Sequence, residues 1–384
     1  MDFLLNDEQR MARNAAREFA EKEIMPRAEK MDRNEQMDEE LLRKLADLGY
    51  MGISIPEEYG GSLTDAVTDI VISMEIGRGD AGVATTMGAS GGLFGGNLND
   101  TGTPEQKQRY LPKIASGEWI GCMGLTEPGA GSDAFSIKTR AEKKGDRYIL
   151  NGTKTFISNA PIADVALIYA TVNPKAGKKG ICTFIVEKDF PGYSAGRKFE
   201  KMGLRSSPTG EIVLEDCEVP EENLVGMEEG KGFRYMVMGL NSERIGWSAL
   251  AVGLAKAAYQ AAFKYSMERE QFGMPIVTFQ LVQDMLAKMS TDVYLGEQSC
   301  VCASTMLNQG LDIALVAAQC KLFCCEMVMR VTSDAVQVHG GYGYTREFPV
   351  ERYMRDAKVF AIGAGTSEVQ KLLIVHQLMS HGIR

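Results

Sequence analysis

Two adjacent charged residues, Glu243 and Arg244, interrupt residues 235–255, an otherwise uncharged segment between Arg234 and Lys256. A helix that is apolar on nearly every face is usually buried. A buried carboxylate is costly unless it is paired, neutralised or needed, and burial raises its pKa, which suits a proton acceptor. Glu243 is therefore a candidate general base. A structural ion pair between the two residues, or a small exposed face, explains the same pattern and stays open at this point.

The same segment is nearly long enough to cross a membrane, but its two central charges and three glycines oppose a membrane span. With 384 residues, 45% hydrophobic and 24% charged, the chain has the composition of a globular protein with two or three substructures. Its net charge of −9 argues against a nucleic-acid-binding surface. We therefore expect neither a membrane span nor a nucleic-acid partner.

Eight cysteines show no paired CxxC framework, and the chain has only three histidines. This pattern predicts no metal site and favours reduced cysteines that fill a core. The N-terminal segment is acidic from position 2 and lacks the features of a signal or transit peptide. We expect a cytoplasmic protein.

Helical patterns occupy the first third of the chain. Asn6 or Asp7 can cap an amphipathic helix that is expected to end near Pro26, and Thr103 opens a later helix with a capping sequence. Small residues dominate positions 81–96, which could form a flexible linker. Apolar neighbours favour close packing instead, as one wall of a ligand site.

From residue 120 the pattern changes to short β-branched runs, and Asn151-Gly152 predicts a hairpin turn. The helical period then returns, with helices expected at 233–269, 279–308, 313–338 and 367–379. The predicted fold is mainly α with a central β domain. It comprises an N-terminal helical domain (1–119), a middle β-barrel or sandwich (120–230) and a C-terminal four-helix bundle (231–384).

Several glycine-containing motifs could contact a phosphate or a flat ring. The loop LTEPGAGSD (125–133) allows close backbone approach, although a generic turn explains it equally well. Arg269 and Phe272 in MEREQFG suit a pyrophosphate and an aromatic face, unless they only end a salt-bridged helix. QVHGGYG (337–343) and GAGTSEVQ (363–370) are turns at helix boundaries, which suit anion contacts.

The chain resembles the acyl-CoA dehydrogenase family over essentially its whole length. The resemblance rests on five motifs in the family's order: LTEPGAGSD, NGTKTFISN, EREQFG, QVHGGYGY and RDAKVFAIGAGTSEVQ. The resemblance implies three domains, a homotetramer, FAD at subunit boundaries, an acyl-CoA substrate and an electron-transfer flavoprotein as partner. It implies that the flavin ring lies against Leu125, Thr126, Ser132, Phe156, Ile157 and Ser158. It places Arg269, Phe272 and Gln280 at the adenine-diphosphate end, with Gln337, Gly340 and Gly341 of a neighbouring subunit.

The resemblance also implies that Thr366 and Glu368 complete the cofactor pocket. The residues it matches to the acyl-CoA thioester are Ser132, Asn241, Arg244, Ala364 and Gly365. Most family members carry the catalytic base as the Glu of a Tyr-Glu-Gly-Thr motif, and here residues 363–366 read Gly-Ala-Gly-Thr. The isovaleryl-CoA and long-chain branches place the base on the helix where this chain has Glu243, and the tail most resembles the isovaleryl branch. Glu243 fills the vacancy.

The expected reaction is α,β-dehydrogenation of an acyl-CoA to the trans-2-enoyl-CoA, with Glu243 removing the α-proton and the β-hydride passing to flavin N5. Gly91, Gly92 and Gly95 suggest room for a short, medium, branched or bulky acyl chain. An enoyl-CoA reductase, a non-oxidative elimination on an acyl-CoA and an inactive FAD-binding scaffold remain as alternatives.

Overall fold

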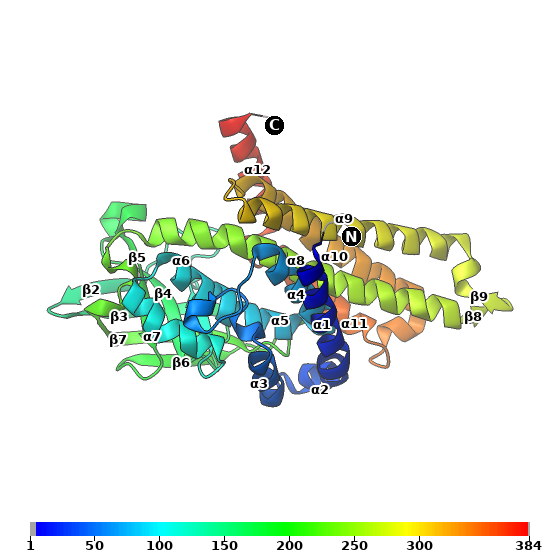
Figure 1. Cartoon of the computed structure of the whole chain (residues 1–384), viewed down its shortest axis with the longest axis horizontal. Helices are drawn as coiled ribbons and strands as arrows, with labels where there is room; N and C mark the ends of the chain where they lie inside the picture. The colour runs from blue at the N-terminus through cyan, green and yellow to red at the C-terminus, as the bar shows by residue number, and fades with distance from the viewer. Residues whose placement is uncertain (1–4, 383–384) are drawn as a thin grey trace.

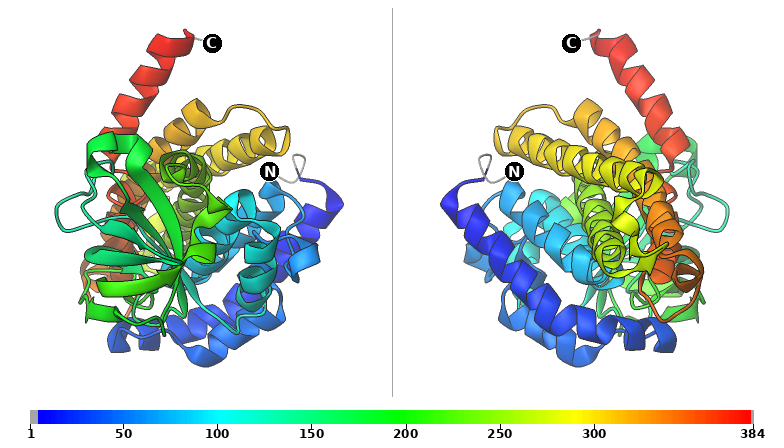
Figure 2. Two further views of the ribbon diagram at one scale, coloured as in Figure 1. Left: turned by 90° about the vertical axis from the view of Figure 1, so that its left-hand side faces the viewer. Right: turned by 90° about the vertical axis from the view of Figure 1, so that its right-hand side faces the viewer.

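The computed structural model describes residues 5–382 of the chain. Helices form both the N-terminal and the C-terminal parts. The strands between residues 121 and 220 gather at one end of the molecule, and two short strands at residues 270–275 lie at the other (Figure 1). Helix α12 (Ser367–His381) projects away from the body in both views of Figure 2. The predicted fold class, mainly α with a central β domain, is confirmed.

The first helix does not end near Pro26, contrary to the sequence prediction. Helix α1 (Asp7–Phe19) begins with a capping box between Asn6 and Gln9 and continues through a π-helical turn (Ala20–Ile24) into α2 (Met25–Asn34). Pro26 lies in the first turn of α2. A proline is tolerated there because the wider π turn absorbs its missing N–H and its ring.

The remaining N-terminal helices build a compact layer. They are α3 (Glu39–Asp47), α4 (Ala66–Gly79), α5 (Ala81–Met87), the π-helical segment Gly88–Gly96, α6 (Asn97–Thr101) and α7 (Pro104–Ala115). Helix α7 starts with the predicted capping box, formed by Thr103 and Gln106. The small-residue segment is helical and largely buried, so it is closely packed rather than a flexible linker.

The expectation that glycines in this segment leave room for an acyl chain is wrong at two of three positions. A Cβ on Gly91 would overlap the carbonyl oxygen of Met51, and one on Gly95 would lie 2.8 Å from the Ile55 side chain. Only Gly92 is open, with its nearest neighbour 3.9 Å away. The chain itself fills the space, because small residues let two backbones approach each other.

The middle of the chain forms one seven-stranded sheet. Its strands are β1 (Gly121–Gly124), β2 (Arg140–Lys144), β3 (Arg147–Ser158), β4 (Val165–Thr171), β5 (Ile181–Glu187), β6 (Tyr193–Lys198) and β7 (Thr209–Pro220). They run in the order β1-β4-β2-β3-β7-β6, and β5 pairs with the other side of β4. Every residue of β4 is buried, which makes this strand the centre of the domain.

The Asn151-Gly152 hairpin is the clearest error of the sequence prediction. These residues lie inside the continuous strand β3, and the turn from β2 to β3 occurs at Gly145 instead. Asn151 exchanges hydrogen bonds with Asp216 on β7, at 3.0 Å and 2.8 Å. The pair holds a register shift between Leu150 and Gly152, so the Asn-Gly sequence serves a β-bulge rather than a turn.

The C-terminal helices agree closely with the predicted segments. They are α8 (Gly232–Glu268), α9 (Gln280–Asn308), α10 (Ala314–His339), α11 (Val350–Ala357) and α12, and the strands β8 (Glu270–Gln271) and β9 (Met274–Pro275) join α8 to α9. Helix α8 packs so closely on α4 that a Cβ on Gly253 would overlap the carbonyl oxygen of Met74. Within residues 5–382, no helix has both the length and the apolar character that a membrane crossing needs.

We predict that Gly152→Ala destabilises the protein more than Gly145→Ala. Gly152 has φ +154°, and a Cβ there would lie 2.5 Å from Thr139 Oγ1. Gly145 has φ +64° with no atom within 4 Å, so its substitution costs only the backbone strain, about 1–2 kcal/mol. Thermal midpoints of both variants measure the difference, and equal midpoints would contradict the assignment of a tight bulge.

Candidate active site

Glu243 lies in the N-terminal half of α8 and is only partly exposed. Burial raises the pKa of its carboxyl group to about 7, although the nearby charges of Arg244 and Lys321 act in the opposite direction. The side chain of Lys321, on α10, is fully buried, and its Nζ has no hydrogen-bond partner among the described residues. A carboxyl group with such a pKa can both take up and release a proton near neutral pH.

Glu243 and Arg244 do not form an ion pair with each other in the part of the chain that the structure describes. Arg244 Nη1 instead donates to Asn241 Oδ1 at 2.6 Å, and Arg244 Nε is buried without a partner. The structural alternative raised by the sequence, a Glu243–Arg244 pair, is therefore wrong. The carboxylate remains free for chemistry, and two of the predicted substrate contacts, Asn241 and Arg244, are held together.

The turn before α12 lies against α8, one helical turn beyond Glu243. A Cβ on Gly363 would lie 3.0 Å from the Trp247 indole, whose Nε1 donates to the Phe360 carbonyl at 3.2 Å. Ala364 and Gly365 both have positive φ, at 54° and 82°. The structure thus brings the tail that lacks a carboxylate next to the helix that carries one.

The same turn is fixed by α12. Gln370 Nε2 donates to the carbonyls of Ala364 and Gly365 at 3.2 Å and 3.0 Å, and Thr366 caps the helix by accepting from the Val369 amide. Glu368 is exposed, and backbone hydrogen bonding at the helix N-terminus lowers its pKa. Ser367 Oγ and Gln370 Oε1 are buried without hydrogen-bond partners within residues 5–382.

A buried ion pair anchors the loop at residues 125–133. Lys154 is fully buried on β3, and its Nζ donates to Glu127 Oε1 at 2.7 Å and to the Leu125 carbonyl at 3.2 Å. Glu127 also accepts from the Lys138 and Thr139 amides. The Thr126 carbonyl accepts from Thr155 at 2.9 Å, so the loop is tied directly to β3.

Phe156, Ile157 and Ser158 follow on that strand at a second register shift. Phe156 has φ +57° and its side chain is 66% exposed, whereas the side chain of Ile157 is buried in the sheet core. Only the backbone of Ile157 can therefore meet a cofactor. Ser132, at the end of the anchored loop, is exposed.

The residues assigned to the adenine-diphosphate end lie at the opposite end of the molecule, beside β8 and β9 (Figure 1). Arg269, Gly340 and Gly341 line one pocket of about 520 Å³. Phe272, at φ +54°, is 92% exposed, and Gln280 and Gln337 are exposed as well. Gly340 and Gly341, which the resemblance assigns to a neighbouring subunit, line the same pocket as Arg269 within this single chain.

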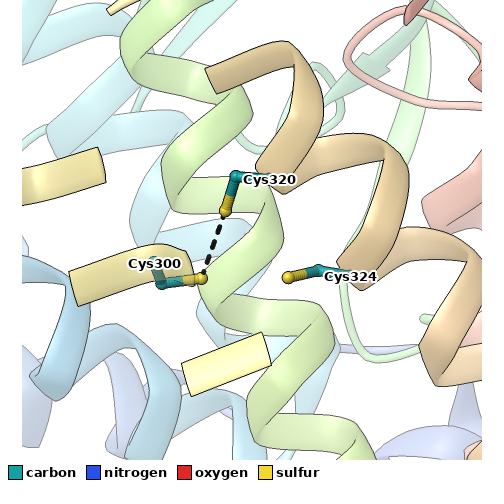
Figure 3. A group of neighbouring side chains, drawn as sticks. All are labelled: Cys300, Cys320 and Cys324. Atoms are coloured by element: carbon teal, nitrogen blue, oxygen red, sulfur yellow. Dashed lines mark hydrogen bonds between the residues drawn. The ribbon is translucent and has the colours of Figure 1, made fainter. Parts of the chain in front are cut away.

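Three cysteines of the helical part converge although no sequence motif links them (Figure 3). The Sγ atoms of Cys300, Cys320 and Cys324 lie within 4.8 Å of one another, and those of Cys300 and Cys320 are 3.6 Å apart. Ser299 Oγ lies 3.4 Å from the Sγ of Cys320 and of Cys324. Such a group could ligate a soft metal ion, although neutral thiols that share hydrogen bonds explain its packing without one.

The comparisons with known proteins cover all three parts of the chain. Residues 6–118, 122–217 and 230–379 match the family profiles described as the acyl-CoA dehydrogenase N-terminal, middle and C-terminal domains. The chain belongs to the acyl-CoA dehydrogenase family. This finding confirms the resemblance seen in the sequence motifs, and it makes the protein an oxidoreductase that acts on acyl-CoA and depends on FAD.

Curated relatives differ in their named reactions. A short-chain-specific acyl-CoA dehydrogenase from Clostridium acetobutylicum is 42% identical over 97% of this chain and 98% of that protein. An acryloyl-CoA reductase (NADH) from Anaerotignum propionicum is 41% identical over 99% and 96%. A mitochondrial isovaleryl-CoA dehydrogenase from Pongo abelii is 39% identical over 96% and 88%.

Solved structures share the whole fold. Butyryl-CoA dehydrogenase from Megasphaera elsdenii superimposes with a TM-score of 0.95 at 40% identity, covering 99% of this chain and 100% of that one. A glutaryl-CoA dehydrogenase from Mycobacterium smegmatis in complex with FADH2 superimposes with a TM-score of 0.94 at 29% identity, covering 100% and 97%.

The residues of this member of the acyl-CoA dehydrogenase family fit FAD. The pocket at Arg269 offers a guanidinium for a pyrophosphate and glycines that allow close approach. The unpartnered Ser367 Oγ and Gln370 Oε1, beside the tail turn, are buried polar atoms that a bound group could satisfy.

Sequence reasoning missed three charged residues of this region: Glu127, Lys154 and Lys321. The two lysines had a signal in the sequence, because Lys154 occupies a strand in a β-branched segment and Lys321 interrupts the apolar run AQCKLFCC. A charge at an inward-facing position of an apolar element needs a partner or a function.

We predict that Lys154→Met lowers both stability and FAD content. The change leaves Glu127 buried without its cation, and breaking a buried pair in this way costs about 3–5 kcal/mol. Lys143→Met is the matched control, because Lys143 pairs with Glu221 where both are exposed. Thermal unfolding and the flavin absorbance of the purified proteins measure the effect. If Lys154→Met kept the stability and flavin content of the control, the pair would not anchor the loop.

Proposed function

We propose that the protein oxidises an acyl-CoA thioester to the trans-2-enoyl-CoA, with Glu243 as the base that removes the α-proton. The observation that carries this proposal is the carboxyl group of Glu243, whose pKa burial raises to about 7, on a helix that packs against the Gly-Ala-Gly-Thr turn. That turn has no acid of its own at the position where most family members carry the base. Glu243 is the carboxyl group that can replace it.

Bound FAD supplies the acceptor for the β-hydride. The chain's own residues bind and orient the cofactor. The flavin ring is positioned by Leu125, Thr126 and the 156–158 segment. The adenine-diphosphate end is held by Arg269, Phe272, Gln280, Gln337, Gly340 and Gly341. Thr366 and Glu368 complete the cofactor pocket, and the Glu368 amide at the N-terminus of α12 donates to the thioester carbonyl. A donor at that oxygen stabilises the charge that develops as the α-proton leaves.

Asn241, Arg244 and Ser132 bind the phosphopantetheine or nucleotide part of the thioester, and Ala364 and Gly365 line the site of the reacting carbons. Arg244 Nε is buried without a partner among residues 5–382, which supports a role in binding a polar group of the substrate. The names of the relatives favour short or branched acyl chains.

The two ends of the proposed FAD site lie far apart on one chain (Figure 1). A single FAD therefore needs its flavin-end residues from one subunit and its adenine-end residues from another. This separation supports a homo-oligomer, and we propose a homotetramer. The mass of the protein in solution, measured by light scattering, tests it; a monomer that retains FAD would contradict shared sites.

A reductase is the second candidate, because one relative is named as an NADH-dependent acryloyl-CoA reductase. Both directions use the same proton site, since Glu243 can return the proton it takes. An electron-transfer flavoprotein is the proposed partner for oxidation. Steady-state assays with that flavoprotein and butyryl-CoA, compared with NADH and an enoyl-CoA, separate the two directions.

We predict that Glu243→Gln retains FAD but loses bleaching of the flavin by an acyl-CoA under anaerobic conditions. The amide keeps the size of the side chain but cannot accept the α-proton, so reduction should slow by about 10²–10⁴-fold. Ser242→Ala, at the exposed neighbouring position, is the control. A Glu243→Gln variant that is reduced at the normal rate would eliminate Glu243 as the base.

In the Glu243→Gln background, Ala364→Glu should restore part of the flavin reduction. Ala364 lies on the turn that packs beside α8 and already has a Cβ at φ +54°, so a longer side chain adds no new backbone strain. The rate of anaerobic bleaching in the double variant measures the rescue. No rescue, in a variant with a normal FAD content, would show that this position does not reach the α-carbon.

The rate of flavin reduction should rise with pH through about 7. Glu243 must be deprotonated to act as a base, and burial raises its pKa to about 7, so the protonated, inactive form prevails below that pH. The apparent second-order rate constant from stopped-flow experiments, between about pH 5.5 and about pH 8.5, reports this ionisation in the free enzyme. A flat profile would place the base elsewhere.

A further inference from the structure

Helices α9 and α10 bring three thiols together inside the large helical core (Figure 3). Cys320 and Cys324 are four residues apart on α10, so they share one face of that helix. Cys300 on α9 points toward them, and all three side chains are buried. The sequence predicts no metal site because it has no paired CxxC framework. Ligands that come from two packed helices need no such motif.

The spacing of the three Sγ atoms suits one shared metal ion. The Sγ atoms of Cys300 and Cys320 are 3.6 Å apart, and all three lie within 4.8 Å of one another. Metal–thiolate bonds of about 2.3 Å in one plane place three sulfurs about 4.0 Å apart. Side-chain shifts of less than about 1 Å therefore convert the group into a three-coordinate site.

A glycine leaves room beside the thiols. A Cβ on Gly296 would lie 2.9 Å from Met327 Cε and 3.7 Å from Cys324 Sγ. Met327 lies three residues beyond Cys324 on the same face of α10, so this face carries a thioether as well as thiols. Ser299 is half-buried, and its Oγ lies 3.4 Å from Cys324 Sγ. An ion can reach the thiols past this side chain.

The polar side chains next to the thiols do not compensate a negative charge on them. Ser299 Oγ donates its proton to the Gly296 carbonyl at 2.8 Å. Lys321 follows Cys320 on α10 but lies about 100° around the helix from it, and Cys325 is the first of the groups whose charges act on that lysine. A buried thiolate without a compensating charge is costly, so a thiolate in this group needs a bound cation.

Cys320 is the thiol of the group that loses its proton most easily. Hydrogen bonds from the Cys300 and Cys324 thiols hold the pKa of Cys320 well below its ordinary value, although burial acts in the opposite direction. Hydrogen bonding to Cys320 and burial raise the pKa of Cys300. One thiolate and two thiols form a neutral unit with a monovalent cation, whereas a divalent ion needs at least one further deprotonation. A neutral unit avoids the cost of a buried net charge.

We propose that Cys300, Cys320 and Cys324 bind one Cu(I) ion between α9 and α10. Thiolate and thioether sulfurs are soft ligands, which suit this ion. The bound ion links the two helices, so its binding stabilises the folded protein. The inference does not depend on the proposed function, because it uses none of the residues assigned to FAD or to the acyl-CoA.

The first test titrates Cu(I) into the reduced, FAD-loaded wild-type protein under anaerobic conditions, in competition with the chromogenic chelator bicinchoninate. We expect one Cu(I) per chain and a thermal midpoint that rises with the Cu(I) concentration. X-ray absorption of the copper-loaded protein should show a first shell made only of sulfur, at about 2.3 Å. An absence of binding, as expected for three neutral thiols that only pack together, would overturn the proposal. A first shell of nitrogen and oxygen would do the same.

The second test compares the double variant Cys320→Ala, Cys324→Ala with Cys302→Ala. Cys302 is the exposed cysteine of α9, two residues from Cys300, so it controls for copper held by a surface thiol. We expect a Kd for Cu(I) in the double variant at least about 100-fold above that of the control, because lost ligands cost more than lost outer-shell partners. Equal Kd values, or loss of binding in Cys302→Ala, would place the ion elsewhere. The X-ray absorption result does not depend on the folding of the double variant.

Zn(II) tests the preference for a monovalent ion. In the wild-type protein, Zn(II) should raise the thermal midpoint less than the same concentration of Cu(I), because its ligation needs further deprotonation of buried thiols. A midpoint that Zn(II) raises as much as Cu(I) would overturn the assignment of a monovalent ion. A disulfide between Cys300 and Cys320 in protein purified anaerobically, detected by mass spectrometry, would also overturn the proposal because it removes two ligands.

Discussion

Desolvation of one carboxyl group, that of Glu243, links the architecture to the proposed chemistry. An ionised carboxylate loses much of its hydration inside a helical layer, and its pKa rises to about 7 because no partner compensates fully. Further along α8, glycines let α4 approach its backbone, and Trp247 donates a hydrogen bond to the Phe360 carbonyl before the tail turn.

A second constraint on the proposed site, the buried ion pair between Lys154 and Glu127, lies in the sheet. Lys154 and Glu127 form a buried ion pair, and Lys154 also donates to the Leu125 carbonyl. These contacts tie the 125–133 loop to β3. A buried pair of this kind contributes little net stability compared with apolar packing, but it specifies one arrangement of the groups around it. The strand therefore positions a loop of small residues that would otherwise be free to move.

The sequence was enough to predict features whose cause is local or periodic. The boundaries of α8 to α10, the capping box at Thr103 and the raised pKa of the Glu243 carboxyl group follow from helical period and from a charge in an apolar segment. The errors arose where distant segments decide the outcome. Asn151-Gly152 was predicted to form a hairpin turn, but Asn151 forms hydrogen bonds with Asp216 on β7 inside a continuous strand. Pro26 was predicted to lie near a helix end, but a π-helical turn lets the helix continue through it. The thiols of Cys300 and Cys320 meet only because α9 and α10 pack together.

The distance between the two halves of the proposed FAD site also has a thermodynamic consequence. If two chains complete each cofactor, every molecule of FAD that binds also stabilises an interface, and every interface that forms raises the affinity for FAD. Dissociation of the subunits on dilution and dissociation of FAD are then coupled to each other. The cell could keep the enzyme loaded through protein concentration as well as through its supply of flavin.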